Sequence, residues 1–242
     1  MNASTLAFGF VLILLLRAPR KAMVQRALIA GLLALLFMPL LTGPEVNGIT
    51  RWLPLGPFQL HAGMLAIPAL AVLAAREPDY APPILLAAIF AALIQPDAAN
   101  GFALLGASAG LYFASPQWRP GVVAILGFAA SLLAAVRGQL PAQPFVERVL
   151  VDAALLHPLA ALALLLAWLA GFLLMLKALP LGKAERYALA GTLGGFMVMA
   201  LISHYPTPLI GYGAAPILGY AIALGLVRGN SRSGIAEQTE GS

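Results

Sequence analysis

Four short polar segments interrupt an otherwise apolar chain and hold four of its nine acids and two of its three histidines. A carboxylate at a membrane surface can act as a general base when it stays ionised yet is partly desolvated, and Glu147 suits that description. Arg51 offers a planar guanidinium that binds phosphate oxygens in pairs. We therefore expect a base and an anion-binding cation on one polar surface. The four segments are residues 43–63, 94–101, 137–153 and 204–213.

Several of these residues also have ordinary structural explanations. Arg51 could pair with Glu45 or with lipid phosphate, and the adjacent Trp52 could anchor the chain at the membrane interface. Asp97 could simply cap the helix that follows it. These alternatives stay open at the level of the sequence.

The third polar segment allows two interpretations as well. Glu147 and Arg148 could form a solvated pair on a surface helix, because PFVERVLVDAAL places charged residues at helical spacing. Asp152, at the start of the next apolar run, is a second candidate base. His157, inside that run, is expected to pack or hydrogen-bond between helices. No spacing of histidines and acids indicates a metal site, so no cofactor is predicted, although a divalent cation remains open.

The elements that must position these residues are membrane helices. Hydrophobic residues make up 61% of the chain and charged residues 10%, with a mean hydropathy of +0.92, which is typical of a polytopic membrane protein. We predict an all-α helical bundle of about nine transmembrane helices, with residues 1–228 as a single transmembrane domain and 229–242 as a disordered cytoplasmic tail. The predicted spans centre on residues 6–16, 27–42, 62–75, 82–93, 100–114, 121–136, 153–176, 187–203 and 210–227.

Basic residues predict the orientation. If the loop RAPRKAMVQR is cytoplasmic, only Arg51, Arg137 and Arg148 of the 14 Lys and Arg residues fall outside. This asymmetry predicts an outside N-terminus and a cytoplasmic C-terminus, with all four polar segments on the outer face around one cavity. The lipid bilayer is the expected partner of the basic loops, and no nucleic acid is needed to explain the net charge of +5.

The polar segments resemble the SEDS family, whose members include FtsW and RodA. GPEVNGITRWLPLGPFQ is similar to the family's outer-loop pattern G-x-x-x-N-G-x-x-R-W-x-x-L-G, and IQPDAANGFALL to its Q-P-D-L-G-T-A. QLPAQPFVERVL stands where the family has L-P-E-A-H-T-D-F, and YPTPLIGYGAAPILGYAIALGLV is similar to its terminal P-L-P-F-I-S-Y-G-G-S-S. All four follow the family's order. The family usually has ten spans, so we expect the first to be missing.

The resemblance implies a peptidoglycan glycosyltransferase in the bacterial inner membrane. Such an enzyme polymerises a prenyl-linked disaccharide during cell division or elongation, and a transpeptidase or another cell-wall assembly protein is the implied partner. Matching of the motifs assigns substrate-binding roles to Asn47, Arg51, Trp52, Gln59, Asp97 and Tyr212.

The implied catalytic acid is displaced in this chain. Five residues past Pro141, where the family places its catalytic Asp, stands Val146; Glu147 follows directly, and Asp152 lies five residues further. Glu147 is therefore the first candidate base and Asp152 the second. The alternatives are a non-catalytic relative that binds a prenyl-linked lipid or an envelope-assembly partner, and a lipid flippase or transporter. No chain of buried acids or bases crosses the predicted spans, which disfavours the transporter.

Overall fold

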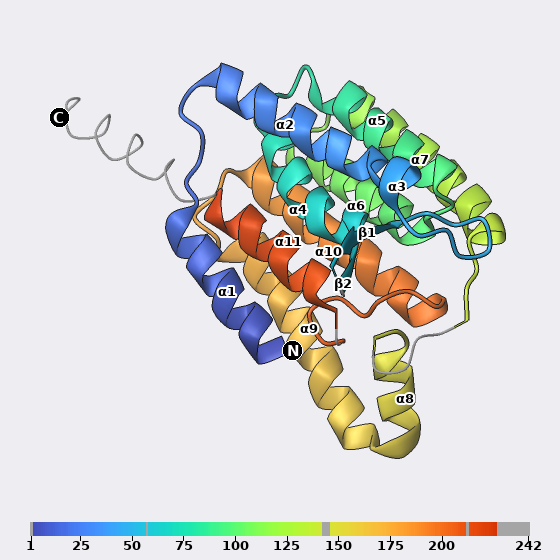
Figure 1. The fold of residues 1–242 in the computed structure, drawn as a ribbon. Helices are drawn as coiled ribbons and strands as arrows, with labels where there is room; N and C mark the ends of the chain where they lie inside the picture. Colours follow the sequence, from blue (N-terminus) through green and yellow to red (C-terminus); the bar gives the residue numbers. More distant parts are fainter. Residues whose placement is uncertain (1, 57, 142–145, 212, 227–242) are drawn as a thin grey trace.

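The computed structural model describes residues 2–56, 58–141, 146–211 and 213–226, and within them the chain forms a helical bundle (Figure 1). Two short helices, α3 (Pro39–Thr42) and α8 (Val149–Leu156), and one hairpin of β1 (Trp52–Leu55) and β2 (Phe58–His61) join the long helices. The long helices are α1 (Asn2–Leu15), α2 (Ala22–Phe37), α4 (Ala62–Ala75), α5 (Ala81–Ile94), α6 (Ala98–Ala114), α7 (Trp118–Arg137), α9 (Pro158–Lys177), α10 (Lys183–Ile202) and α11 (Ala214–Gly225). The predicted tail lies outside the described residues.

The long helices coincide with the predicted apolar runs, which confirms the helical fold. Their number does not settle how many cross the membrane. In the described part of the chain, three segments are long and apolar enough to do so, namely 22–42, 118–137 and 158–177. A helix such as α4, with 14 residues, rises about 21 Å, less than the ~30 Å of a hydrocarbon core. The count of nine spans therefore remains a prediction.

Two local features differ from the predicted pattern. The first polar segment contains an antiparallel hairpin in which Trp52 pairs with His61, so the fold is not helical throughout. The predicted seventh span is divided at His157, which ends α8, while Pro158 begins α9. A proline lacks the N–H needed to continue a helix and disfavours helical backbone at the preceding residue. The expectation that His157 packs between helices is wrong, because its side chain is exposed.

Small residues hold the centre of the bundle together. Gly106 of α6 and Gly191 of α10 face each other so closely that a Cβ on either would overlap the carbonyl group of the other. Gly195 likewise lies against the carbonyl of Phe102. Lipid tails are as apolar as the helices, so the hydrophobic effect does not drive helices together in a membrane. The close approach of two backbones supplies van der Waals contact instead. α4 is buried along most of its length beside this pair.

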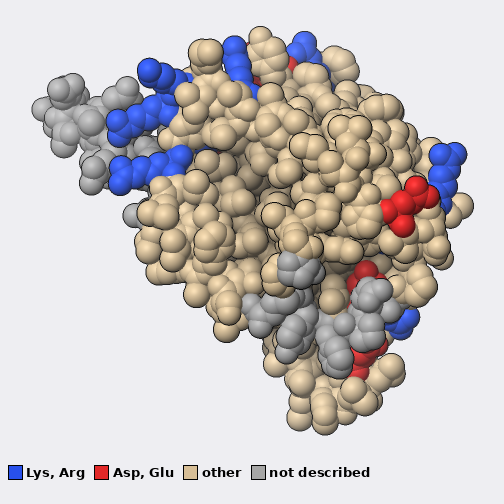
Figure 2. Space-filling view, in the orientation of Figure 1, with Lys and Arg blue, Asp and Glu red and all other residues tan. Residues whose placement is uncertain are grey.

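The loops separate into two ends of the bundle. One end, which we call the polar-loop end, brings together the four polar segments and the start of α1, where Asn2 Nδ2 donates to Gly211 O (3.2 Å). The other, the basic end, joins the start of α2 to the α4–α5 turn through Gln25 Nε2 and Glu77 Oε1 (3.0 Å). Figure 2 shows Lys and Arg side chains gathered over the end where α2 begins. Contacts that join the four polar segments confirm their predicted grouping at one end of the bundle: those between Arg51 and Tyr205, His61 and Asp97, and Glu147 and Pro206.

Candidate functional site

The site is built on the first turns of two buried helices at the polar-loop end. His61, the last residue of β2, caps α4 because its Nδ1 accepts the N–H of Met64 (3.3 Å). Asp97 caps α6 because its Oδ1 accepts the N–H of Asn100 (3.1 Å). Since Nδ1 of His61 is an acceptor, the hydrogen-bond pattern places the imidazole proton on Nε2. Nε2 lies 3.1 Å from Oδ2 of Asp97, at ion-pair distance but without the alignment of a hydrogen bond.

Arg51 supplies the positive charge of the site. Its side chain is 1% exposed, and its Cζ lies 4.9 Å from the ring centroid of Trp52 and 4.8 Å from that of Tyr205. Both contacts are cation–π interactions. Nε and Nη1 of Arg51 have no hydrogen-bond partner among the described residues. We call Arg51, Trp52, His61, Asp97 and Tyr205 the Arg51 cluster.

The cluster holds Asp97 in its ionised form. Burial by itself raises the pKa of this carboxyl group, but His61, the charge of Arg51 and the N–H of Asn100 together outweigh burial and hold the pKa of Asp97 below its ordinary value. Tyr205 accepts the N–H of Ala98 (3.0 Å), which is the first residue of α6. Burial and the nearby Asp97 raise the pKa of Tyr205 to about 12, so its hydroxyl stays protonated at neutral pH.

Glu147 lies beside this cluster through its backbone. It forms an isolated β-bridge with Pro206, the residue after Tyr205, and the carbonyl of Val146 accepts the N–H of Thr207 (2.8 Å). The residue is 5% exposed and precedes α8. The alternative of a solvated pair on a surface helix is therefore wrong for Glu147.

Among the described residues, the charged residues that follow Glu147 in the chain do not contact the Arg51 cluster. Arg148 has a left-handed backbone (φ 56°), and its Nη1 lies 3.4 Å from Nε2 of His204, whose Nδ1 contacts Leu140 O at 3.0 Å. Asp152 is exposed on α8, which Figure 1 shows beside the start of α9 and beyond the rest of the bundle. The structure thus separates the two candidate bases: Glu147 adjoins the Arg51 cluster and Asp152 does not.

The remaining predicted site residues divide between turn positions and undescribed positions. Asn47 (φ 52°) and Gly48 (φ 77°) form the tight turn between Val46 and Ile49, whose backbones exchange two hydrogen bonds of 3.0 Å. Asn47 is exposed there, as is Gln59 on β2. Tyr212 lies outside the described residues. Across the described parts of the chain, no group of three His, Asp or Glu side chains could hold a metal ion.

Two alternatives from the sequence are resolved by these contacts. Asp97 does cap α6, as the simpler explanation predicted, and it also contacts His61. Arg51 is buried against aromatic rings while Glu45 is exposed, and among the described residues no ion pair joins them. Arg51, His61 and Asp97 are each less than 5% exposed, so the polar loops meet as a packed cluster and not as an open cavity at this point.

Sequence reasoning did not place His61 and Tyr205 in the site. His61 stands directly before an apolar run, at a position that caps helices, and this signal could have identified it as a structural partner. Nothing in the spacing of Tyr205 indicates that it contacts Arg51 or α6, which are far away in the chain. The two residues complete the surroundings of Arg51 and Asp97.

The fold and the site define a polytopic helical membrane protein with a buried charged cluster at one end. RodA of Thermus thermophilus, a rod shape determining protein, has the same fold: a variant superposes with a TM-score of 0.67 and 23% identity over 93% of this chain and 85% of that one. A chain from a peptidoglycan synthase complex, studied for its coordination of polymerization and crosslinking, superposes with a TM-score of 0.65 and 19% identity over 93% and 86%.

Sequence similarity agrees with this fold. The chain is 34% identical over 125 residues to the probable peptidoglycan glycosyltransferase FtsW of Halorhodospira halophila, which covers 44% of this chain and 32% of the relative. For FtsW of Pseudoalteromonas translucida the identity is 34% over 113 residues, or 40% and 28%. The matched region thus spans about a third of these relatives, and no family model matches the chain. The predicted resemblance is confirmed in sequence by the FtsW relatives and in fold by RodA.

Proposed function

We propose that the chain is a glycosyltransferase that polymerises prenyl-linked disaccharide into peptidoglycan glycan, during cell division or elongation. The names of the FtsW relatives support this activity, and the RodA-like fold is consistent with it. The observation that carries the proposal is the buried guanidinium of Arg51, which keeps Nε and Nη1 without a hydrogen-bond partner among the described residues. A buried cation with free donors suits an anionic group such as the pyrophosphate of the lipid-linked donor.

The chemistry needs a base as well as a cation. Glu147 takes the proton of the acceptor sugar hydroxyl, whose oxygen bonds to the anomeric carbon of the donor. The bond from that carbon to the pyrophosphate breaks, and the pyrophosphate leaves with the electron pair. Arg51 offsets the charge that develops on the leaving group, while Asp97 and Tyr205 keep the guanidinium in place. In this proposal Trp52, Asn47, Gln59 and Tyr212 contribute to substrate binding around the cluster.

The proposal includes an orientation and a partner. The polar-loop end faces the outside of the bacterial inner membrane, with the N-terminus outside and the C-terminus in the cytoplasm. A crosslinking transpeptidase is the proposed partner, because one structural neighbour belongs to a peptidoglycan synthase complex that combines polymerization with crosslinking.

A glycan-synthesis assay with purified protein and lipid-linked disaccharide tests the proposal. Glu147→Gln keeps the shape of the side chain but cannot accept a proton, so we expect product to fall by about 10²- to 10⁴-fold. Asp152→Asn, the matched control on exposed α8, should leave synthesis far less affected. Arg51→Lys should also impair synthesis, because a point charge replaces a fork of donors.

The outcomes separate the candidate functions. If the unmutated protein makes no glycan even with a transpeptidase present, the chain is a non-catalytic relative that binds a prenyl-linked lipid or an assembly partner. If it makes glycan and Glu147→Gln is as active as Asp152→Asn, another residue is the base. A loss confined to Glu147→Gln and Arg51→Lys supports Glu147 as the base and Arg51 as the cation that binds the pyrophosphate.

A further inference from the structure

At the basic end, a polar cavity adjoins an apolar groove. The cavity has a volume of about 490 Å³ and is lined by Arg20, Gln25, Arg76 and Glu77. The groove, of about 270 Å³, runs between α2 and α5 and shares Glu77 with the cavity. The two hollows together therefore offer polar and apolar surface to one amphipathic ligand.

The acid that lines the cavity, Glu77, and the acid beside Arg76, Glu185, are already matched by basic partners. Glu77 accepts from Gln25 Nε2 (3.0 Å) and from Arg26 Nη2 (3.2 Å). Glu185 is ion-paired with Nε of Arg76, whose Nη2 donates to Leu226 O at 3.0 Å. Arg26 and Arg76 thus balance Glu77 and Glu185 one to one.

Arg20 and Lys21 carry the excess positive charge. Both side chains are exposed, and in the ranges that the structure describes neither forms an ion pair. Arg20 lines the polar cavity directly, and Lys21 stands at the start of α2 next to it. The cavity therefore favours an anion.

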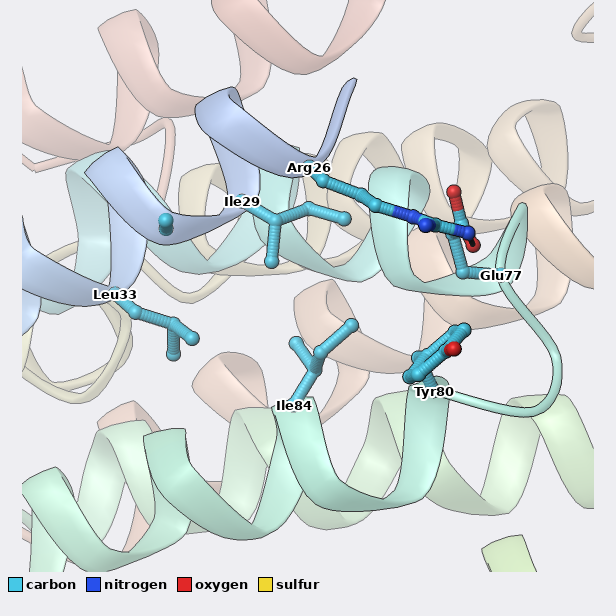
Figure 3. Close-up of a pocket in the computed structure, with 7 residues that line it drawn as sticks. Arg26, Ile29, Leu33, Glu77, Tyr80 and Ile84 are labelled. Carbon is cyan, nitrogen blue, oxygen red and sulfur yellow. Dashed lines mark hydrogen bonds and ion pairs between the residues drawn. The ribbon is translucent and has the colours of Figure 1, made fainter. Parts of the chain in front are cut away.

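The groove supplies the apolar half of the site. Figure 3 shows Ile29 and Leu33 of α2 on one side and Ile84 of α5 on the other, with the Arg26–Glu77 pair at one end. Cζ of Arg26 lies 5.1 Å from the ring centroid of Tyr80, which fixes the pair over that end of the groove. Ala30, an exposed residue of α2, also lines it. A flexible hydrocarbon chain suits such a lining.

We propose that an anionic phospholipid of the surrounding leaflet binds at this position. Its phosphate lies in the polar cavity near Arg20 and Lys21, and one acyl chain lies in the groove between α2 and α5. A soluble phosphate would use the cavity alone, whereas a lipid uses both hollows. The bound lipid would join the α1–α2 loop, α2 and the α4–α5 turn, and this role is independent of whether the chain polymerises glycan.

Native mass spectrometry of the detergent-purified protein tests the proposal with phosphatidylglycerol and phosphatidylcholine as probes. We expect one phosphatidylglycerol to be retained in preference to phosphatidylcholine. Arg20→Gln should weaken retention about fivefold, the equivalent of about 1 kcal/mol for one basic residue near the headgroup. Arg119→Gln is the matched control, since Arg119 is also exposed but does not line either hollow.

A second pair of variants tests the groove. Ala30→Phe fills the groove and should reduce retention of phosphatidylglycerol, whereas Ala27→Phe, at an exposed position of α2 outside the lining whose side chain tilts toward the start of the helix, should not. Equal retention of the two lipids, or equal losses in Arg20→Gln and Arg119→Gln, would overturn the proposal. So would full retention in Ala30→Phe, or displacement of the lipid by soluble glycerol phosphate at matched concentration, which would assign the cavity to a free phosphate.

Discussion

Removal of the negative charge of Asp97 is expected to destabilise the protein strongly. Asp97→Asn preserves an oxygen that can accept the N–H of Asn100, so the cap of α6 survives and only the charge is lost. Arg51 then remains charged in a site where it is 1% exposed. The substitution therefore isolates the electrostatic role of Asp97 from its role as a helix cap.

The burial of both groups sets the expected magnitude. Asp97 is 0% exposed, so water screens its interactions with His61 and with the charge of Arg51 very little. Removing one of two buried, mutually stabilising charges typically costs about 3–5 kcal/mol, because the other charge stays buried without compensation. Among the described residues the ion-pair contact of Asp97 is with His61 and no ion pair joins it to Arg51, so the lower end of this range applies. For a chain of this size, about 3 kcal/mol corresponds to a fall in Tm of roughly 6–12 °C.

Thermal unfolding in detergent micelles, followed by tryptophan fluorescence, measures this effect. Asp152→Asn makes the same chemical change on exposed α8 and should alter stability by less than about 0.5 kcal/mol. Adding Arg51→Met to Asp97→Asn should restore part of the loss, since the uncompensated charge is then absent. If Asp97→Asn and Asp152→Asn unfold at the same temperature, Arg51 is compensated by a group other than Asp97, and the electrostatic account of the cluster is wrong.

Three further results are expected from the same unfolding assay. Because the pKa of Asp97 is lowered in the folded state, the stabilisation of the protein by this carboxylate is complete above the ordinary carboxyl pKa of about 4 and is lost as the pH falls through the pKa of the folded state. The difference in Tm between wild type and Asp97→Asn should therefore narrow below about pH 4, and a constant difference would contradict this. Gly106→Ala should cost about 1–3 kcal/mol by forcing α6 away from the carbonyl of Gly191, whereas Gly171→Ala, with open space around it, should not destabilise; equal effects would refute the close contact. Asn47→Val should cost about 1–2 kcal/mol because its φ of 52° is strained for a β-branched residue, and Asn47→Gly should be tolerated; similar Tm values for the two would show that the turn rearranges.

The positions of the helices could be predicted because they depend on local properties. Long apolar runs bounded by proline, glycine and polar residues form helices wherever the backbone must satisfy its own hydrogen bonds in lipid. The four polar segments follow every second predicted span and therefore fall at the same end of the bundle, which is why their meeting there was predictable. The break at His157 was missed although Pro158 carries a local signal for it, because the apolar pattern continues through both residues.

The sequence by itself determined the helical class, the segregation of polar loops and the importance of Arg51 and Asp97 as candidate site residues. Only the tertiary structure decided which side chains surround them: Tyr205 reaches the start of α6 across 107 positions of the chain, and Glu147 rather than Asp152 is joined to the segment beside it. Residue spacing within one helix or turn cannot specify such contacts. They follow from how closely the helices pack, since the glycine faces of α6 and α10 and the buried α4 set the separation of the loops that carry each charge.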